Sequence, residues 1–109
     1  AFQLGFNEMN LKELIGIIKS RKNSGAKDSY TASLLKKGLG RCGQKFGEEA
    51  VELIVASMEG DQKHAKQEAA DVLYHYLVLL EAQDISLDEI LIILEQRTKM
   101  SGFEEKLSR

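Results

Sequence analysis

The chain has 109 residues, of which 43% are hydrophobic and 29% are charged, and it contains neither proline nor tryptophan. This length predicts one domain with a small core, and abundant Leu, Ile, Ala, Glu and Lys without proline favour an all-α fold. The net charge of −2 gives no basic surface for nucleic acid, and no apolar run is long enough to span a membrane. We expect a cytoplasmic protein, because the single Cys42 cannot form an intrachain disulfide.

Four main helices are predicted within one helical domain at residues 10–99, flanked by tails at 1–9 and 100–109. Their expected limits, in chain order, are residues 10–23, 43–59, 61–83 and 86–99. The first and last helices begin with a capping residue that is followed by an acid three positions later, Asn10 with Glu13 and Ser86 with Glu89. Gly60 is expected to end the second helix, because glycine readily adopts the left-handed conformation found there.

A short helix and a glycine-spaced segment are predicted before the second main helix. Ser29 or Thr31 can cap the short helix, which should end at Gly38. The spacing from Gly38 to Gly43 matches a P-loop, but no strand precedes it and Gln44 stands where lysine is required. Two interpretations stay open, a solvated connector or a set of backbone amides that holds phosphate with nearby cations. Those cations are Lys36, Lys37 and Arg41.

Acidic side chains form a narrow stripe on each of the two central predicted helices, at about 100° of rotation per residue. The stripe on the first of them contains Lys45, Glu48, Glu49 and Glu52. The stripe on the next contains His64, Glu68, Asp71 and His75. The remaining faces of both helices are apolar, whereas an ordinary surface helix has a polar face about as wide as its apolar one. These acids therefore form polar seams on helices that should otherwise be buried.

Carboxylates placed this closely need a compensating cation. Two charges about 4 Å apart repel by about 1 kcal/mol in water and by about 4 kcal/mol at an effective dielectric of 20. Oxygen ligands without thiolates suit a hard ion, so we expect magnesium, with manganese as the alternative. A di-iron site is disfavoured, because it requires Glu-x-x-His and this chain has Glu49-x-x-Glu52 and Glu68-x-x-Asp71. A solvated acidic face without a metal is the remaining interpretation.

The apolar faces of the two central helices exceed what the rest of a short chain can cover. We therefore expect a homodimer in which these helices form a shared core. A compact monomeric bundle is the alternative.

Three motifs resemble those of the phosphoribosyl-ATP pyrophosphohydrolase family, in the MazG-like superfamily of all-α nucleotide pyrophosphohydrolases. They are Ser29-Tyr30-Thr31, Gln44-Lys45-Phe46-Gly47-Glu48-Glu49-Ala50-Val51-Glu52 and Glu68-Ala69-Ala70-Asp71-Val72-Leu73-Tyr74-His75. The resemblance runs from about Asn10 to Arg97. It implies a MazG-like helical bundle that hydrolyses N1-phosphoribosyl-ATP to phosphoribosyl-AMP and pyrophosphate, the second step of histidine biosynthesis. A separate phosphoribosyl-AMP cyclohydrolase that uses the product is an expected functional partner.

The resemblance also implies roles for individual residues. The metal ligands are expected to be Glu49, Glu52, Glu68 and Asp71. Glu48 is a further ligand or the base that orients water, while Lys45 would stabilise charge on the leaving pyrophosphate. The substrate-binding residues are expected to be Ser29, Tyr30, Thr31, Lys36, Arg41, Lys45, Tyr74 and His75.

Two departures and two alternatives accompany this hypothesis. The family usually has an aliphatic residue at the position of Phe46, and residues 40–43 also differ from its pattern. The first alternative is a housecleaning pyrophosphohydrolase for simple or damaged nucleoside triphosphates, with the same metal site. The second is a non-catalytic helical interaction module.

Overall fold

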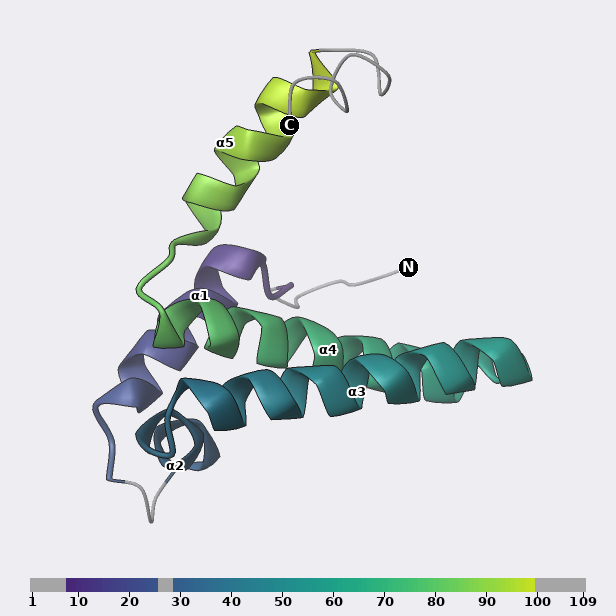
Figure 1. Cartoon of the computed structure of the whole chain (residues 1–109), viewed down its shortest axis with the longest axis horizontal. Coiled ribbons are helices and arrows are strands. Elements are labelled where there is room, and N and C mark those ends of the chain that lie inside the picture. The colour runs from purple at the N-terminus through teal and green to yellow at the C-terminus, as the bar shows by residue number, and fades with distance from the viewer. Residues whose placement is uncertain (1–7, 26–28, 100–109) are drawn as a thin grey trace.

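The computed structural model describes residues 8–25 and 29–99, and this part of the chain is helical with short connections. Its helices are α1 (Leu11–Lys22), α2 (Tyr30–Lys36), α3 (Leu39–Glu59), α4 (Gln62–Ala82) and α5 (Leu87–Thr98). The two longest, α3 and α4, form an antiparallel hairpin, and α1 and α2 lie at one end of it (Figure 1). The all-α prediction is confirmed. The predicted tails lie outside the described residues, except for positions 8 and 9.

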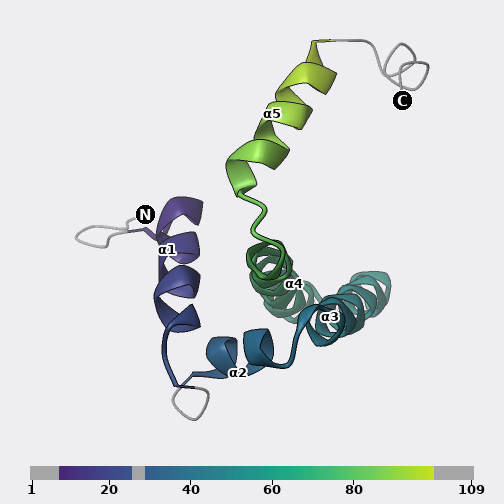
Figure 2. The same ribbon diagram turned by 60° about the vertical axis from the view of Figure 1, so that its left-hand side comes forward.

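The core lies where α1 and α2 meet the first turns of α3 and the last turns of α4 (Figure 2). Its fully buried cluster consists of Ile18, Leu34, Cys42, Leu77 and Val78. The opposite end of the α3–α4 hairpin extends beyond this core (Figure 1). Much of the apolar surface on the hairpin is therefore open to solvent in a single chain.

The start of α3 differs from the sequence prediction. The helix begins at Leu39, so the segment from Leu39 to Gly43 is helical and the interpretation of a solvated connector was wrong. Cys42 explains this, because its side chain is fully buried in the core and its Sγ donates to the Leu34 carbonyl oxygen at 3.6 Å. This packing offsets the roughly 1 kcal/mol that each glycine costs inside a helix. Gly38, with a φ of 99°, makes the turn that separates α2 from α3.

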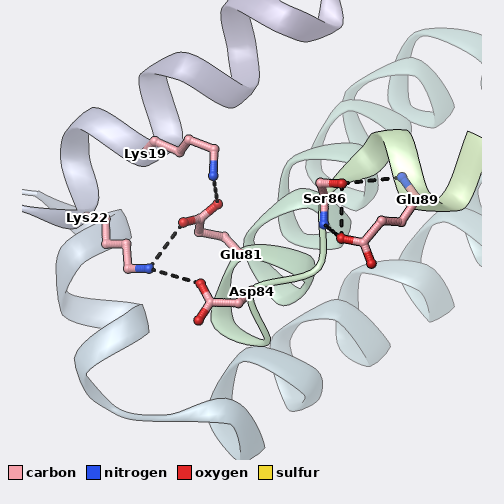
Figure 3. Close-up of polar contacts among 6 residues, drawn as sticks. All are labelled: Lys19, Lys22, Glu81, Asp84, Ser86 and Glu89. Atoms are coloured by element: carbon pink, nitrogen blue, oxygen red, sulfur yellow. Dashed lines mark hydrogen bonds and ion pairs between the residues drawn. The ribbon is translucent and has the colours of Figure 1, made fainter.

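A buried acid joins α1 to the end of α4. The carboxylate of Glu81 lies 2.9 Å from Nζ of Lys19 and 3.2 Å from Nζ of Lys22 (Figure 3). Lys22 also lies 3.8 Å from a carboxylate oxygen of Asp84. Burial alone would raise the pKa of Glu81, but the hydrogen bonds and positive charges of both lysines outweigh burial and lower it. The ionised carboxylate therefore stabilises the packing of α1 on α4.

The predicted helix caps are confirmed at both ends of the described chain. The side chain of Asn10 accepts a hydrogen bond from the backbone N–H of Glu13, whose carboxylate accepts one from the N–H of Asn10. Ser86 and Glu89 form the same reciprocal pair at the start of α5 (Figure 3). Gly60 ends α3 with a φ of 78°, as expected for a left-handed terminator.

The last helix, α5, points away from the other four (Figures 1 and 2). All twelve residues of α5 are described, and none of them is buried. Its large exposed apolar residues are Leu91, Ile92, Ile93 and Leu94. Among the described residues, no helix is long and apolar enough to cross a membrane. Leu87, Asp88 and Leu91 line a hollow of about 430 Å³ together with residues of α1 and α4, so the start of α5 faces the other helices while most of its apolar surface is exposed.

Candidate metal and substrate site

The α3–α4 hairpin brings three carboxylates from two helices together. One oxygen each from Glu49, Glu68 and Asp71 lies within 4.8 Å of the others. Glu49 lies in the middle of α3, and Glu68 and Asp71 lie one turn apart on α4. Glu49 and Glu68 are half-buried, whereas Asp71 is exposed. The cluster therefore opens toward solvent on one side while two of its acids are embedded in the hairpin.

Two oxygen atoms in this cluster are buried without a partner. Oε2 of Glu49 and Oε2 of Glu68 have no hydrogen-bond donor in the structure. Buried polar atoms are almost always satisfied in proteins, and each of these oxygens is available to a bound group. The set consists of carboxylate oxygens alone, which magnesium and manganese prefer. The residues present thus fit a hard divalent cation.

The electrostatics of Glu49 reflect the crowding of acids. The pKa of Glu49 is raised to about 7, first by a hydrogen bond with the Glu52 carboxyl and then by burial. The negative charges of Glu52 and Asp71 raise this pKa further, and the charge of Lys45 opposes them. Glu52 thus lies beside Glu49, although it is outside the three-carboxylate cluster. A divalent cation would relieve the repulsion that makes Glu49 hold its proton.

A second pair of charges lies beside the cluster on α3. Nζ of Lys45 lies 3.4 Å from Oε1 of Glu48, and this hydrogen bond is the main reason that the pKa of Lys45 is raised. Both side chains line an open hollow of about 640 Å³. The other residues that line it are Gly47, Glu49, Val51 and Glu52. Charges of both signs therefore face one solvent-accessible region next to the acidic cluster.

An aromatic group borders the charged residues on the α2 side. The ring centroids of Tyr30 and Tyr74 lie 6.5 Å apart, and the edge-on ring of His75 lies 6.0 Å from Tyr30. His75 is only 5% exposed, and its Nδ1 has no hydrogen-bond partner. Burial and then the charge of Lys45 lower the pKa of His75, while Asp71 and Glu48 partly raise it. His75 therefore connects the aromatic group to the charged site.

The other predicted binding residues have different surroundings. Oγ of Ser29 caps α2 by accepting from the N–H of Ala32, and the buried hydroxyl of Thr31 forms a hydrogen bond with the hydroxyl of Tyr74. Both hydroxyls therefore form hydrogen bonds with other groups of the protein, and these bonds fix the position of α2. Lys36 is exposed at the end of α2, and Arg41 is half-buried in the first turn of α3. Direct contact between these side chains and a substrate stays a prediction.

Two contacts around the site differ in how far they can be predicted from the sequence. The Thr31–Tyr74 hydrogen bond links positions 43 residues apart, and nothing local in the sequence indicates such a pairing. Nε2 of His64 lies 3.3 Å from Oε1 of Glu68, within one turn of α4. The second contact is predictable from the sequence, because His64 and Glu68 are four residues apart on one helix.

Comparison with known proteins identifies the family. Residues 11–98 match the family described as phosphoribosyl-ATP pyrophosphohydrolase, which covers most of the chain. The chain belongs to this family. The matched region contains α1 to α5 and all of the acids of the candidate site.

Individual relatives agree with this assignment. The chain is 50% identical to "Phosphoribosyl-ATP pyrophosphatase 1" of Rhodopseudomonas palustris, over 91% of this chain and 92% of that protein. It is also 50% identical to the protein of the same name from Bradyrhizobium diazoefficiens, with 91% and 93% of the two chains covered. "Phosphoribosyl-ATP pyrophosphatase" of Dinoroseobacter shibae is 50% identical, with 91% and 97% covered. The similarity therefore extends over nearly the whole length of each relative.

Proposed function

We propose that this protein hydrolyses N1-phosphoribosyl-ATP to phosphoribosyl-AMP and pyrophosphate, the second step of histidine biosynthesis. The observation that carries the proposal is the cluster of Glu49, Glu68 and Asp71, which lies inside the region matched to the family. The relatives' names refer to this substrate. The reaction breaks the α–β phosphoanhydride with one water molecule, whose oxygen joins the α-phosphorus while pyrophosphate leaves.

Magnesium is the proposed cofactor, with manganese as the alternative. Glu49, Glu68 and Asp71 would hold the ion, and Glu52 is the neighbouring carboxylate available to join them. A divalent ion bound there would neutralise phosphate charge and lower the pKa of a water molecule. The two unpartnered buried oxygens of Glu49 and Glu68 support this assignment.

Two side chains on α3 would act on the proton of the attacking water and on the negative charge of the leaving pyrophosphate. The carboxylate of Glu48 is about half exposed and is the proposed base that accepts a proton from the attacking water. Lys45 forms an ion pair with Glu48, so its ammonium group is already held beside the acids. Once phosphates enter the hollow, Lys45 would stabilise the negative charge on the leaving pyrophosphate.

The active form is proposed to be a homodimer. Four exposed apolar residues cover one side of α3, and Leu73 is an exposed apolar residue of α4; the four on α3 are Val51, Ile54, Val55 and Met58. The radius of gyration is 16.6 Å, whereas a compact domain of this length has about 13 Å. At about 100° per residue, the apolar stripe of α3 adjoins its acidic stripe, so a second chain packed on it would lie beside the site. The exposed apolar face of α5 gives this second chain a further surface to cover.

The activity is tested by measuring pyrophosphate release from phosphoribosyl-ATP, with magnesium and with EDTA, beside ATP and dUTP. Magnesium-dependent release from phosphoribosyl-ATP alone is the expected result. Release mainly from ATP or dUTP would instead support a housecleaning pyrophosphohydrolase with the same metal site. No release from any of the three, with no binding of magnesium, would leave the non-catalytic interaction module.

The proposal also implies a second enzyme that uses the product of this one. Its product, phosphoribosyl-AMP, is what a separate phosphoribosyl-AMP cyclohydrolase would use, and we expect both activities in the cytoplasm. Co-purification is not required for this link, because the product can diffuse between the enzymes. A coupled assay in which added cyclohydrolase consumes the product would test it.

A further inference from the structure

Tyr30 is an exposed aromatic side chain at the edge of the charged site. Its relative exposure is 55%, although it is the first residue of α2 and lies directly before the buried Thr31. The ring packs on Tyr74 with 24° between the two ring planes, and the His75 ring meets it edge-on at 86°. Part of the Tyr30 ring is thus supported by the protein, and the rest of its surface is open to a ligand.

The position of Tyr30 is fixed by its neighbours. The hydroxyl of Thr31, which is 1% exposed, forms a buried hydrogen bond with the hydroxyl of Tyr74 on α4. Ser29 caps the same turn through its hydrogen bond from the N–H of Ala32. The turn that carries Tyr30 is therefore held to α4 before any ligand arrives. A ring held in this way loses little conformational entropy when a flat group stacks on it.

Tyr30 also lies close enough to the charged residues to share a ligand with them. The centroid of its ring lies 6.0 Å from that of His75, which follows Asp71 by one turn of α4. The acids and Lys45 belong to α3 and α4, whereas Tyr30 approaches from α2. A molecule with phosphates at one end and an aromatic ring at the other matches this separation of charge and aromatic surface.

We propose that Tyr30 is the platform on which the purine ring of the nucleotide stacks. This proposal rests on the proposed function, and it names the group that recognises the base rather than the phosphates. Stacking uses the face of the ring, so it needs the aromatic side chain and not its hydroxyl. A purine offers a larger face than a pyrimidine, so the platform favours purine nucleotides.

The test compares ligands that contain a base with one that does not. Calorimetry on the full chain with magnesium would measure the affinities for AMP, CMP and pyrophosphate. Tyr30→Leu should weaken AMP binding about tenfold, the scale of one lost base–aromatic stack, and change pyrophosphate binding by less than about twofold. Tyr30→Phe should bind AMP like the wild type. The matched control is Met9→Ala, which removes a similarly exposed side chain before α1.

A spectroscopic readout accompanies the affinities. The chain has three tyrosines and no tryptophan, so its intrinsic fluorescence comes from tyrosine. AMP should quench this fluorescence in the wild type, and the quenching should be smaller in Tyr30→Leu at saturating AMP. In steady-state assays with phosphoribosyl-ATP, the same substitution should act more on KM than on kcat. Circular dichroism of each variant would establish that its helices are intact.

Several results would overturn the proposal. They are equal losses of AMP and pyrophosphate affinity in Tyr30→Leu, equal losses in Tyr30→Phe and Tyr30→Leu, or an unchanged AMP affinity in Tyr30→Leu. Failure of the wild type to bind AMP at millimolar concentration would do the same. The binding arms need no turnover, so a wild-type chain that binds AMP through Tyr30 but does not hydrolyse phosphoribosyl-ATP would refute the proposed function alone.

Discussion

A carboxylate oxygen of Glu49 on α3 and one of Glu68 on α4 lie within 4.8 Å of each other, although the residues face each other across a helical hairpin. Each residue also buries an oxygen that has no hydrogen-bond partner. Two acids in this position oppose the packing of the hairpin unless a cation lies between them. The relationship thus links the stability of α3 and α4 to the binding of a metal.

Replacing Glu49 by glutamine should abolish activity without unfolding the protein. The substitution keeps the shape of the side chain but removes the charge that would hold the cation, so we expect turnover to fall by at least about 100-fold. The helical circular-dichroism signal should be retained. Glu59→Gln, an exposed acid at the end of α3, is the matched control and should keep its activity. Wild-type turnover in Glu49→Gln would remove Glu49 from the metal site.

Magnesium or manganese should raise the melting temperature of the wild-type protein. A ligand at 100 times its dissociation constant stabilises the folded state by about 2.7 kcal/mol, which corresponds to roughly 10 °C or more for a domain of this size. The shift should disappear with EDTA and in Glu68→Gln. Differential scanning fluorimetry would measure it. A full shift in Glu68→Gln would show that the ion binds elsewhere.

The ion pairs of Glu81 should make stability depend on pH. The folded-state pKa of Glu81 lies below its ordinary value of 4.5, so the stabilisation is present above pH 4.5 and is lost as the pH falls through the lowered pKa. Glu81→Gln should cost about 1 kcal/mol at pH 7, a value reduced because both lysines are partly exposed. The difference in melting temperature from the wild type should shrink toward pH 3.

The control for Glu81 is the neighbouring Asp84, whose side chain is 91% exposed and lies 3.8 Å from Lys22. Asp84→Asn should leave the melting temperature unchanged at both pH values. A constant difference between Glu81→Gln and the wild type from pH 7 to pH 3 would contradict the assignment.

The proposed dimer should dissociate when a charge is placed in the exposed apolar stripe of α3. Ile54 is 58% exposed in the single chain, so Ile54→Lys would cost a monomer little, but it would bury a charge in a dimer interface. Light scattering should give twice the chain mass of 12.2 kDa for the wild type and that mass itself for the variant. Arg21→Ala, on the exposed side of α1, should remain dimeric. A monomeric wild type at micromolar concentration would refute the dimer.

The hydrogen bond between Thr31 and Tyr74 should contribute measurably to stability. Thr31→Val keeps the shape of the side chain but leaves the Tyr74 hydroxyl without its partner, which should cost about 1 to 2 kcal/mol. Thr31→Ser keeps a hydroxyl and should recover part of that loss. Urea unfolding would measure the difference between the two variants. Equal stability of Thr31→Val and the wild type would show that this contact is unimportant.

The features that were predictable from the sequence depend on interactions within one helix. The capping boxes of Asn10 with Glu13 and of Ser86 with Glu89 need only residues three apart, so they are visible in the chain itself. The acidic stripes were visible for the same reason. The register that brings Glu68 to Glu49 depends on the length of the hairpin, which the terminator Gly60 indicates.

The features that were not predicted depend on packing between distant segments. The early start of α3 was not predicted, because the burial of Cys42 among α2 and α4 decides the conformation there and depends on the fold. The role of Glu81 also depends on tertiary contacts with α1. The indication in the sequence is the position of this acid. Glu81 directly follows the buried Leu80 and lies one turn after Leu77 and Val78, on the apolar face of α4. Which lysines pair with Glu81 is visible only in the folded structure, because α1 and α4 are far apart in the sequence.

The exposure of α5 has a consequence for how the helix forms. Twelve residues is about the length at which a helix in water is only marginally stable by itself, and α5 buries none of its residues in the chain. Its capping box favours the first turn, but the apolar run from Leu91 to Leu94 gains nothing from facing solvent. In the proposed dimer a second chain covers α5, so dilution of that dimer should lower the helical content of the protein before its core unfolds. The ellipticity of dilute samples would then report the assembly of the protein as well as its folding.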